Sequence, residues 1–359
     1  MGRTGTYIVL DANLKRIERE NNIDIYNYLK HIRSQRNFMV QTESQYVFIH
    51  EALIEYLSAG GTEAEVATFR DRVKHLQQPS ESLPGETNMD EEFRKLNLFD
   101  ESVQKKTNAA SAPYNKSKNR FLNVLAYDET RVALRQIPNV QGSDYINANY
   151  VHGYSQAKQF IATQAPLPHT VPDFWRLVWE HHSNTIVCLS QETENGKVKI
   201  HRYWPGIETV IHGPLMIEKH TQETTYGDFV KRELKVTHTT EGHSRIVTHF
   251  QYVGWPENSH PESGSGMLEM IGEVQKCKRD SIGSVAVHCC AGGGRTGVFI
   301  ALCNMIERVR AEGVVDVFQT VRELRKQRAA MVQTKQEYAF CYLAFQDFLA
   351  SFDIYQNFF

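Results

Sequence analysis

Cysteine, long apolar runs and an excess of charge of either sign are all scarce in this sequence. Its 359 residues contain six cysteines, the first of them Cys188, and no CxxC pair. We therefore expect neither a disulfide framework nor a structural zinc site, and the chain suits a reducing compartment. The formal net charge is −2, with both signs mixed along the chain, so there is no basic stripe for nucleic acid or an anionic membrane surface.

Long hydrophobic segments are missing too. No run of about 18 apolar residues occurs, as a membrane-spanning helix would need, and the N-terminus lacks the apolar core of a signal peptide. Hydrophobic residues nevertheless make up 41% of the chain and aromatics 11%, which is enough for a sizeable core. We expect a soluble, cytoplasmic, globular protein that needs no cofactor and does not insert into a membrane.

The most informative stretch runs from Val285 to Gly297 and is typical of a buried strand, a glycine-rich loop and the start of a helix. Small residues let consecutive backbone N–H groups turn inward, and the helix that opens at Thr296 adds the positive end of its dipole. The pattern predicts a phosphate cradle at the carboxyl end of the strand. Its lining is expected to be Cys290, Ala291, Gly292, Gly293 and Gly294.

A thiol and a guanidinium flank this loop. Cys289 enters it and Arg295 leaves it six residues later, so both can converge on one phosphate, the arginine through a bidentate fork. A helix N-terminus, a neighbouring cation and inward amides stabilise a thiolate, which predicts Cys289 as the nucleophile of a phosphoryl transfer. An inert buried cysteine is the alternative, but it does not explain the strand, the three glycines and the helix around it.

The stretch His-Cys-x-Ala-Gly-x-Gly-Arg-Thr-Gly resembles the signature of the protein tyrosine phosphatases, and the chain follows that family from about Asp90 to Phe352. Further family motifs stand in order: Lys118-Asn119-Arg120-Phe121, Ser143-Asp144-Tyr145-Ile146-Asn147-Ala148, Phe160-Ile161-Ala162-Thr163-Gln164, Asp173-Phe174-Trp175, Tyr203-Trp204-Pro205, Trp255-Pro256-Glu257 and Met331-Val332-Gln333-Thr334. The whole resembles the second, membrane-distal domain of a receptor-type tandem phosphatase, nearest to the leukocyte-antigen-related group.

The resemblance implies an α/β (α+β) fold, with a twisted mixed sheet flanked by helices, and hydrolysis of phosphotyrosine in proteins through a cysteinyl-phosphate intermediate. A receptor relative would hold such a domain on the cytoplasmic side of a single-pass membrane protein. The implied partners are phosphotyrosine proteins and another phosphatase domain of the same or a second receptor.

Several roles follow from the resemblance alone. His288 would support the thiolate from behind, with a buried histidine satisfied by the backbone as an equal alternative. The Thr296 hydroxyl would help sulfur leave, and Gln333 would position the hydrolytic water. Asn123 and Lys199 match substrate-binding positions.

Glu194, together with Lys199, matches a charged loop that braces the arginine and the acid loop; solvated surface charges are the alternative reading of this pair. The lining residue Cys290 stands where the family usually has serine and puts two thiols side by side. Oxidation to a sulfenic acid or a local disulfide is conceivable for such a pair.

Three further departures bear on activity. Glu257 stands where active members carry the aspartic acid that protonates the leaving group, and its extra methylene predicts a misplaced acid. Phe121 replaces a tyrosine of the pocket wall but keeps the ring that contacts a substrate ring; a core position is its alternative. Glu337 replaces a glutamine and puts a carboxylate near an anionic site.

These departures leave two readings of function open. We expect a phosphatase with attenuated activity; the alternative is a weak or inactive module that binds phosphotyrosine, a partner or a neighbouring catalytic domain. A dual-specificity phosphatase is less favoured, because its shallow pocket would not need the wall that ends at Phe121.

The sequence also contains an internal duplication. Gly2-Arg3-Thr4-Gly5 repeats Gly294-Arg295-Thr296-Gly297, and the likeness continues without a gap at an offset of 292. The first copy begins one residue before its arginine, so it carries no nucleophile and is interpreted as the tail of another phosphatase domain, truncated in nature or by a gene model. Its helices, about Thr4–Asn21, Asp24–Gln35 and Thr42–Ser58, should expose apolar surface.

The expected domains are residues 1–58 as truncated helices, 59–88 as an interdomain linker with a helical piece at Glu63–Leu76, and 89–359 as the complete domain. Thr185–Leu189 and Ser284–Val287 are typical of central strands buried on both faces, while Phe229–Val236 and Arg245–Tyr252 predict an antiparallel pair. The predicted helices are Glu91–Leu98, Pro172–Glu180, Gly266–Lys276, Gly297–Arg310, Asp316–Gln327 and Lys335–Leu349.

Overall fold

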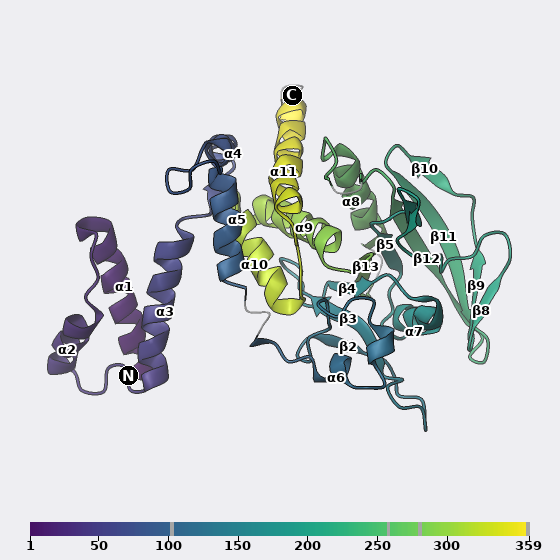
Figure 1. Ribbon diagram of the computed structural model, residues 1–359, viewed down its shortest axis with the longest axis horizontal. Helices are drawn as coiled ribbons and strands as arrows, with labels where there is room; N and C mark the ends of the chain where they lie inside the picture. The colour runs from purple at the N-terminus through teal and green to yellow at the C-terminus, as the bar shows by residue number, and fades with distance from the viewer. Residues whose placement is uncertain (101–103, 257–258, 279–281, 357–359) are drawn as a thin grey trace. The chain divides into compact units, whose positions relative to one another are not determined.

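The computed structural model describes residues 1–100, 104–256, 259–278 and 282–356. Two compact units make up the chain, Met1–Thr62 and Glu63–Phe359 (Figure 1). Each unit has its own cluster of buried apolar side chains. Within the described ranges, no helix is long and apolar enough to cross a membrane.

The smaller unit consists of helices and contains no strand within residues 1–62, all of which are described. Its helices are α1 (Gly2–Glu20), α2 (Ile25–Gln35) and α3 (Glu43–Ala59). Asp24 and Thr42 cap α2 and α3, since each side chain accepts a hydrogen bond from a backbone N–H of the first turn. The apolar surface expected here is present: Tyr7 is 70% exposed and Phe48 53%.

The larger unit is built on a mixed sheet. Among the described residues, ten strands form it in the order β2-β3-β4-β13-β5-β12-β11-β9-β8, with β10 paired to β11. The strands are β2 (Arg131–Ala133), β3 (Tyr145–Val151), β4 (Phe160–Gln164), β5 (Thr185–Cys188), β8 (Val210–His212), β9 (Leu215–Lys219), β10 (Thr224–Tyr226), β11 (Phe229–His238), β12 (His243–Tyr252) and β13 (Val285–Cys289). Short pairs form outside it: β1 (Ala64–Glu65) with β14 (Val314–Val315), and β6 (Thr193–Glu194) with β7 (Lys197–Val198).

Parallel pairing is confined to the middle of this sheet. β13 runs parallel to β4 and β5, and β5 runs parallel to β12. All residues of β4, β5 and β13 are buried, as expected of strands covered on both faces. The predicted antiparallel pair is β11 with β12.

Helices cover both faces of the sheet. They are α4 (Phe69–Gln77), α5 (Asn88–Leu98), α6 (Asn108–Ser111), α7 (Val171–Glu180), α8 (Ser265–Lys278), α9 (Gly294–Glu312), α10 (Val317–Gln327) and α11 (Lys335–Gln356), with short 3₁₀ turns η2 (Lys116–Lys118) and η3 (Pro168–Thr170). α7 packs Phe174 and Leu177 into the same core as Ala286 of β13. The neighbours of Ala286 on β13 point to the opposite face, on the side where Figure 1 shows α8 to α11.

Part of the predicted linker, residues 59–88, belongs to the larger unit and needs correction. The expected helix Glu63–Leu76 is a strand, β1, followed by α4, and β1 pairs with β14. Phe69 of α4 is 1% exposed and stacks on Tyr342 of α11, with ring centroids 5.8 Å apart. Burial of this ring gives the segment from Glu63 onward a packed position that a linker would lack.

Candidate active site

The glycine-rich loop lies where β13 ends and α9 begins. Cys289 is the last residue of β13 and only 5% exposed, and α9 starts at Gly294. Gly292 has φ +74°, and a Cβ there would lie 2.1 Å from the Thr163 carbonyl oxygen. Glycine is therefore required at this position both by its backbone conformation and by the close approach of β4.

The peptide groups of the loop are turned by a buried cation below it. Arg328 is completely buried and donates to the carbonyl oxygens of Ala291 (Nη2, 3.2 Å) and Gly292 (Nε, 2.5 Å). Because C=O and N–H point in opposite directions in a trans peptide, the N–H groups of Gly292 and Gly293 face away from Arg328. The Gly292 N–H indeed reaches Cys289 Sγ at 3.3 Å.

The first peptides of the loop are anchored in the same manner. The Ala165 N–H, just after β4, donates to the carbonyl oxygens of Cys289 (3.0 Å) and Cys290 (3.2 Å). The N–H groups of Cys290 and Ala291 consequently point away from Ala165. Carbonyls are held outward and amides are left for an anion, which is the arrangement predicted for a phosphate cradle.

Arg295 lies in the first turn of α9, and part of its guanidinium is already hydrogen-bonded within the protein. Its Nη1 and Nη2 donate to both carboxylate oxygens of Glu194 at 2.7 and 3.0 Å, and Nη1 also donates to the Leu189 carbonyl. Its guanidinium carbon lies 5.3 Å from the centroid of the Trp255 ring. Among the described residues no partner takes Nε–H or the second Nη2–H, so the side of the guanidinium remains open for a bidentate contact.

A tight hairpin positions Glu194. β6 and β7 are joined by Asn195 and Gly196, whose φ angles are 46° and 75°, as in the type I′ turn that Asn-Gly favours. Glu194 is 7% exposed, so its bidentate pair with Arg295 is a buried brace and not a solvated surface charge.

His288 is a neutral, buried histidine in the structure. Burial lowers its pKa to about 4. Its Nε2 lies 2.6 Å from the hydroxyl of Tyr203, which also contacts Nε2 of His249 at 2.9 Å. His288 thus holds the end of β13 through a hydrogen-bonded network and carries no positive charge at neutral pH.

Cys290 is oriented toward the neighbouring loop. Its thiol donates to the Lys199 carbonyl oxygen at 3.2 Å, and burial raises its pKa. Cys289 and Cys290 are both free thiols in the structure. Lys199 therefore contributes its backbone to this side of the loop.

Thr296 and Gln333 differ in their exposure to solvent. Thr296 is completely buried, and its hydroxyl has no hydrogen-bond partner among the residues described. Gln333 is exposed and precedes α11. Glu337 packs against Gly294, where an added Cβ would lie 2.1 Å from its Oε1.

Glu337 also has a structural task. Its carboxylate accepts the N–H groups of Gln333 (2.8 Å) and Thr334 (3.0 Å), while its own N–H donates to the Thr334 hydroxyl. This reciprocal pattern is a capping box at the start of α11. Burial raises the pKa of Glu337, although Arg295 opposes that shift.

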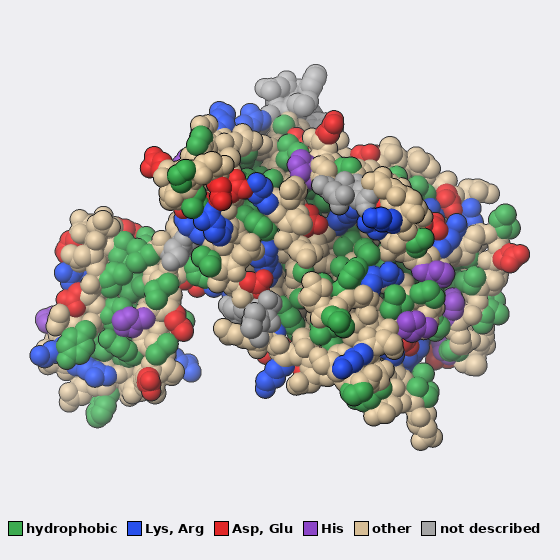
Figure 2. Space-filling view, viewed as in Figure 1, with side chains coloured by type: hydrophobic (Ala, Val, Ile, Leu, Met, Phe, Trp, Pro, Cys, Tyr) green, Lys and Arg blue, Asp and Glu red, His purple; other side chains and the backbone are tan. Residues whose placement is uncertain are grey.

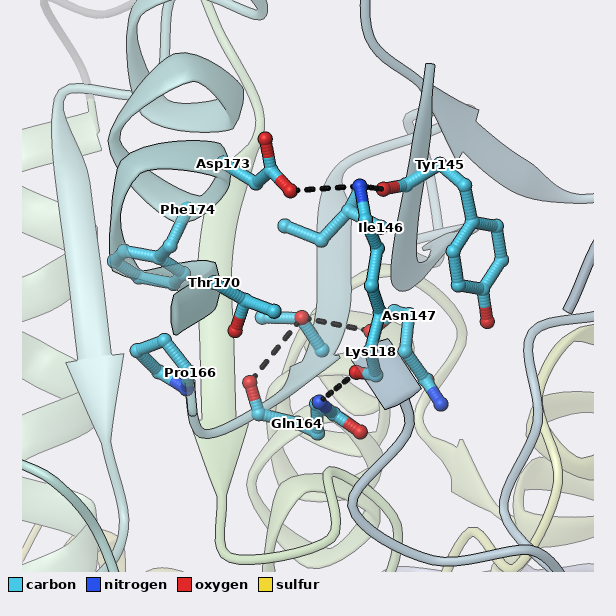
Figure 3. Close-up of a pocket in the computed structure, with 10 residues that line it drawn as sticks. Lys118, Tyr145, Ile146, Asn147, Gln164, Pro166, Thr170, Asp173 and Phe174 are labelled. Atoms are coloured by element: carbon cyan, nitrogen blue, oxygen red, sulfur yellow. Dashed lines mark hydrogen bonds and ion pairs between the residues drawn. The ribbon is translucent and has the colours of Figure 1, made fainter. Parts of the chain in front are cut away.

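The predicted wall loop, from Lys118 to Phe121, is fixed from behind. Figure 3 shows Lys118 Nζ between Asp173 and the Tyr145 carbonyl, at 2.9 and 3.2 Å. Gln164 clamps the same loop by donating to the Lys118 carbonyl. The cavity beside these residues measures only about 10 Å³, roughly the space of one water, so we assign this cluster to support of the wall.

The tip of the wall faces solvent. Phe121 is 41% exposed and Leu122 80%, and Asn123 is exposed as well. Phe121 is therefore not a core residue, which leaves its ring free for a ligand. The proposed acid, Glu257, lies outside the described residues, although Trp255 of the same motif is buried at 3% exposure.

Two contributors were not predicted from the sequence. Arg328 lies in the second copy of the duplication but was not singled out, and Tyr203 was named only as part of a motif. Among the described residues, no group of three or more His, Cys, Asp or Glu side chains is placed to hold a metal ion.

Comparisons with known proteins agree with this geometry. The family described as protein-tyrosine phosphatase matches residues 1–55 and 115–347, and so covers both copies of the duplication. Receptor-type tyrosine-protein phosphatase S of Gallus gallus is 46% identical over 359 residues, 99% of this chain and 23% of the relative. Tyrosine-protein phosphatase Lar of Drosophila melanogaster is 44% identical over 361 residues, 99% of this chain and 18% of the relative.

Receptor-type tyrosine-protein phosphatase alpha of Homo sapiens is 42% identical over 362 residues, which cover all of this chain (100%) and 44% of the relative. The chain thus spans less than half the length of each of these curated relatives. With the fold, the loop and these matches together, the chain belongs to the protein-tyrosine phosphatase family and is similar to its receptor-type members.

Proposed function

We propose that the larger unit hydrolyses phosphotyrosine in proteins through a cysteinyl-phosphate intermediate, at an attenuated rate. The observation that carries this proposal is the loop itself: the Gly292 N–H lies on Cys289 Sγ while the carbonyls of the same loop are drawn back by Arg328. A sulfur at the focus of inward amides is suited to attack an anionic phosphoryl group.

In the first step, the Cys289 thiolate attacks phosphorus and the bond from phosphorus to the tyrosine oxygen breaks. Loop amides and the open side of Arg295 hold the equatorial phosphoryl oxygens. The carboxylic acid of Glu257 gives its proton to the departing phenolate. The exposed ring of Phe121 packs on the substrate ring, and Asn123 lies beside it on the same loop.

In the second step, a water positioned by Gln333 attacks phosphorus and gives a proton to the Glu257 carboxylate. The sulfur–phosphorus bond breaks and inorganic phosphate is released. The buried Thr296 hydroxyl, which lacks a partner in the described structure, donates a hydrogen bond to the departing Sγ. His288 keeps the strand end in place as a neutral residue.

Attenuation follows from Glu257. Its side chain is one methylene longer than aspartate, and a displacement of about 1 Å in a catalytic group can cost on the order of a hundredfold in rate. The carboxylate of Glu337 against Gly294 adds a second cost, because it opposes the binding of a dianion.

That same carboxylate favours a second candidate function. A cradle that holds phosphotyrosine weakly, and turns it over slowly or not at all, would serve as a regulatory or phosphotyrosine-binding module of a receptor phosphatase. In either case we place the unit on the cytoplasmic side of a receptor, with phosphotyrosine proteins and another phosphatase domain as partners.

The two functions are separated by hydrolysis of para-nitrophenyl phosphate by the whole chain, by Cys289→Ser and by Glu257→Asp. We expect the chain to exceed Cys289→Ser by at least about tenfold, and Glu257→Asp to raise kcat by about 10- to 100-fold. Equal rates for all three proteins would end the enzyme proposal. Retention of a phosphotyrosine peptide by Cys289→Ser would then support the binding module.

A further inference from the structure

A groove on the larger unit lies at the edge of the sheet opposite the phosphate cradle. β5, β12 and β13 run parallel, so the carboxyl ends of all three share the edge where Cys289 lies, and their amino ends share the other. His182 precedes β5, and His243 and Arg245 begin β12. These residues line a cavity of about 610 Å³, a volume within the range of ligand sites in proteins.

The floor of this groove is a stacked aromatic surface. The guanidinium carbon of Arg245 lies 3.8 Å from the centroid of the Trp179 ring, and its Nη2 donates to the Trp179 carbonyl at 2.6 Å. The His238 ring lies 5.5 Å from the same indole at an angle of 31°. Ile137, Pro214 and Leu215 add apolar lining. A bulky apolar side chain would find contact here.

The charges around this floor are unbalanced. Glu180 is already paired with Arg176 at 3.3 Å, and Glu241 lies 3.7 Å from the His238 ring nitrogen. Arg135 is exposed, and in the described part of the chain neither Arg135 nor Arg245 has a carboxylate within ion-pair distance. The lining thus holds three arginines (Arg135, Arg176 and Arg245) and two glutamates (Glu180 and Glu241), so its formal charge is positive with the histidines neutral. Figure 2 shows histidines gathered on this part of the surface, near α7 and the β8–β9 end of the sheet.

We propose that this groove binds an acidic peptide segment of a partner protein, with carboxylates at Arg135 and Arg245 and one bulky apolar side chain against the apolar lining formed by Ile137, Pro214 and Trp179. An acidic peptide fits better than a nucleic acid or another polyanion, for two reasons. Glu180 and Glu241 interrupt the positive rim, and much of the lining is apolar, which a polyanion would leave uncovered. The site is separate from the cradle and does not depend on the function proposed for it.

The test is fluorescence anisotropy of a short fluorescein-labelled peptide in which glutamates alternate with leucine and phenylalanine. The whole chain is titrated with inorganic phosphate present to occupy the cradle. We expect saturable binding that weakens as salt is raised. A peptide with serine in place of leucine and phenylalanine, at equal charge, should bind at least about fivefold more weakly, since it loses the apolar contact.

Matched variants locate the site. Arg135→Glu and His243→Glu change exposed residues of the groove, while Arg36→Glu makes the same charge reversal at an exposed arginine of the smaller unit. We expect at least about a fivefold loss of affinity for each groove variant and less than about twofold for Arg36→Glu. Absent binding, equal losses for all variants, equal binding of the serine peptide, or preferential binding of a single-stranded oligonucleotide would each overturn the proposal.

Discussion

A similar helical sequence occurs twice in this chain and folds into three helices each time, but only the second copy belongs to a unit that contains a sheet in the described structure. α1, α2 and α3 begin at Gly2, Ile25 and Glu43; adding 292 gives the first residues of α9, α10 and α11. Both copies of the loop before the third helix place two residues at positive φ, with Val40 at 55° and Val332 at 52°. Such strain at a β-branched residue is uncommon, and its repetition shows that it belongs to the motif.

The hydrogen bonds behind this strained turn are repeated as well. Arg33 donates Nε to the Met39 carbonyl and Nη2 to that of Val40, and Arg325 makes the same pair of bonds to the residues at the corresponding offset. The three helices, the caps of α2 and α3, and the two hydrogen bonds of Arg33 therefore form in the smaller unit without strands around them. The shared geometry is local, and the sheet is not needed to specify it.

The two copies differ in how deeply their corresponding side chains are buried. Phe48 is 53% exposed, whereas its counterpart Phe340 is fully buried against Trp255, with ring centroids 5.2 Å apart. The arginine that directly follows the second helix of each copy differs in the same way: Arg36 is exposed and Arg328 is completely buried. One motif thus supplies a surface arginine in one setting and the support of a phosphate cradle in the other.

The largest difference between the two copies should appear in the free energy of unfolding when each of these arginines is replaced by leucine. Arg328→Leu leaves the oxygens of Asn147, Asn149 and two loop carbonyls without their donor, which should cost more than about 3 kcal/mol of the free energy of unfolding. Arg36→Leu should change it by less than about 0.5 kcal/mol. Hydrogen exchange followed by mass spectrometry reads the two units separately.

A conservative change supplies the control for Arg328→Leu. Arg328→Lys keeps the charge but offers no planar fork, so its loss of stability should fall between those of wild type and Arg328→Leu, and phosphate should bind more weakly. Similar losses at Arg36 and Arg328 would mean that burial under the loop is not what separates the two copies.

The strand, loop and helix around Cys289 could be predicted because their signals are local: an apolar run, glycines and a helical pattern lie next to one another. Arg328 could not. Its partners Asn147 and Asn149 are far away in the sequence, and a fully buried arginine contradicts the usual preference of that residue.

The strand β3 went unpredicted for a related reason. Its asparagines Asn147 and Asn149 give Tyr145–Val151 a polar pattern, and their burial is compensated by hydrogen bonds from Arg328 to their side-chain oxygens and from their amide nitrogens to remote loop residues. The prediction of a linker missed the packing of α4 for a similar reason. α4 is held to the larger unit by residues remote in sequence: the Glu92 carboxylate accepts hydrogen bonds from Arg72 of α4 and from Tyr338 of α11. The sequence pattern indicates local structure, whereas these long-range polar pairs appear only in the fold.

The next effect depends on pH and is specific to the larger unit. The pKa of His288 is lowered to about 4 by burial, whereas an unfolded histidine titrates near 6.5. The unfolded state therefore binds more protons, so stability is complete above about pH 6.5 and falls as the pH drops toward 4, by about 3 kcal/mol for this residue. Burial also lowers the pKa of His249, which adds a loss of the same sign.

Tryptophan fluorescence measures this loss in the right unit, since all four tryptophans of the chain lie in the larger unit. We expect His288→Gln, which cannot titrate, to show a shallower fall in the free energy of unfolding between pH 6.5 and 4 than wild type. The carboxyls Asp90 and Glu91, whose pKa values are lowered to about 2 by their hydrogen bonds, lose their contribution mainly below about pH 4.5, and they do so equally in both proteins. Identical pH profiles for the two proteins would contradict a neutral, buried His288.

The smallest effect concerns a position where the copies share a contact but differ in charge. Gln45 and Glu337 both accept the N–H four residues earlier, at 2.8 Å in each copy, and both side chains would meet a Cβ placed on the first glycine of the copy. Glu337→Gln should therefore keep the cap and remove only the charge. We expect phosphate, as a competitive inhibitor of para-nitrophenyl phosphate hydrolysis, to bind about three- to tenfold more tightly.

That gain should shrink at acidic pH, because burial raises the pKa of Glu337 and its protonated carboxyl then resembles the amide of the variant. Gln45→Glu is the matched reversal in the smaller unit, and it should leave inhibition by phosphate unchanged, since that copy has no cysteine to complete a cradle within residues 1–62. If Glu337→Gln instead destabilised the larger unit without changing the inhibition constant, the carboxylate would be a capping residue alone, and the attenuation expected of this unit would rest on Glu257 alone.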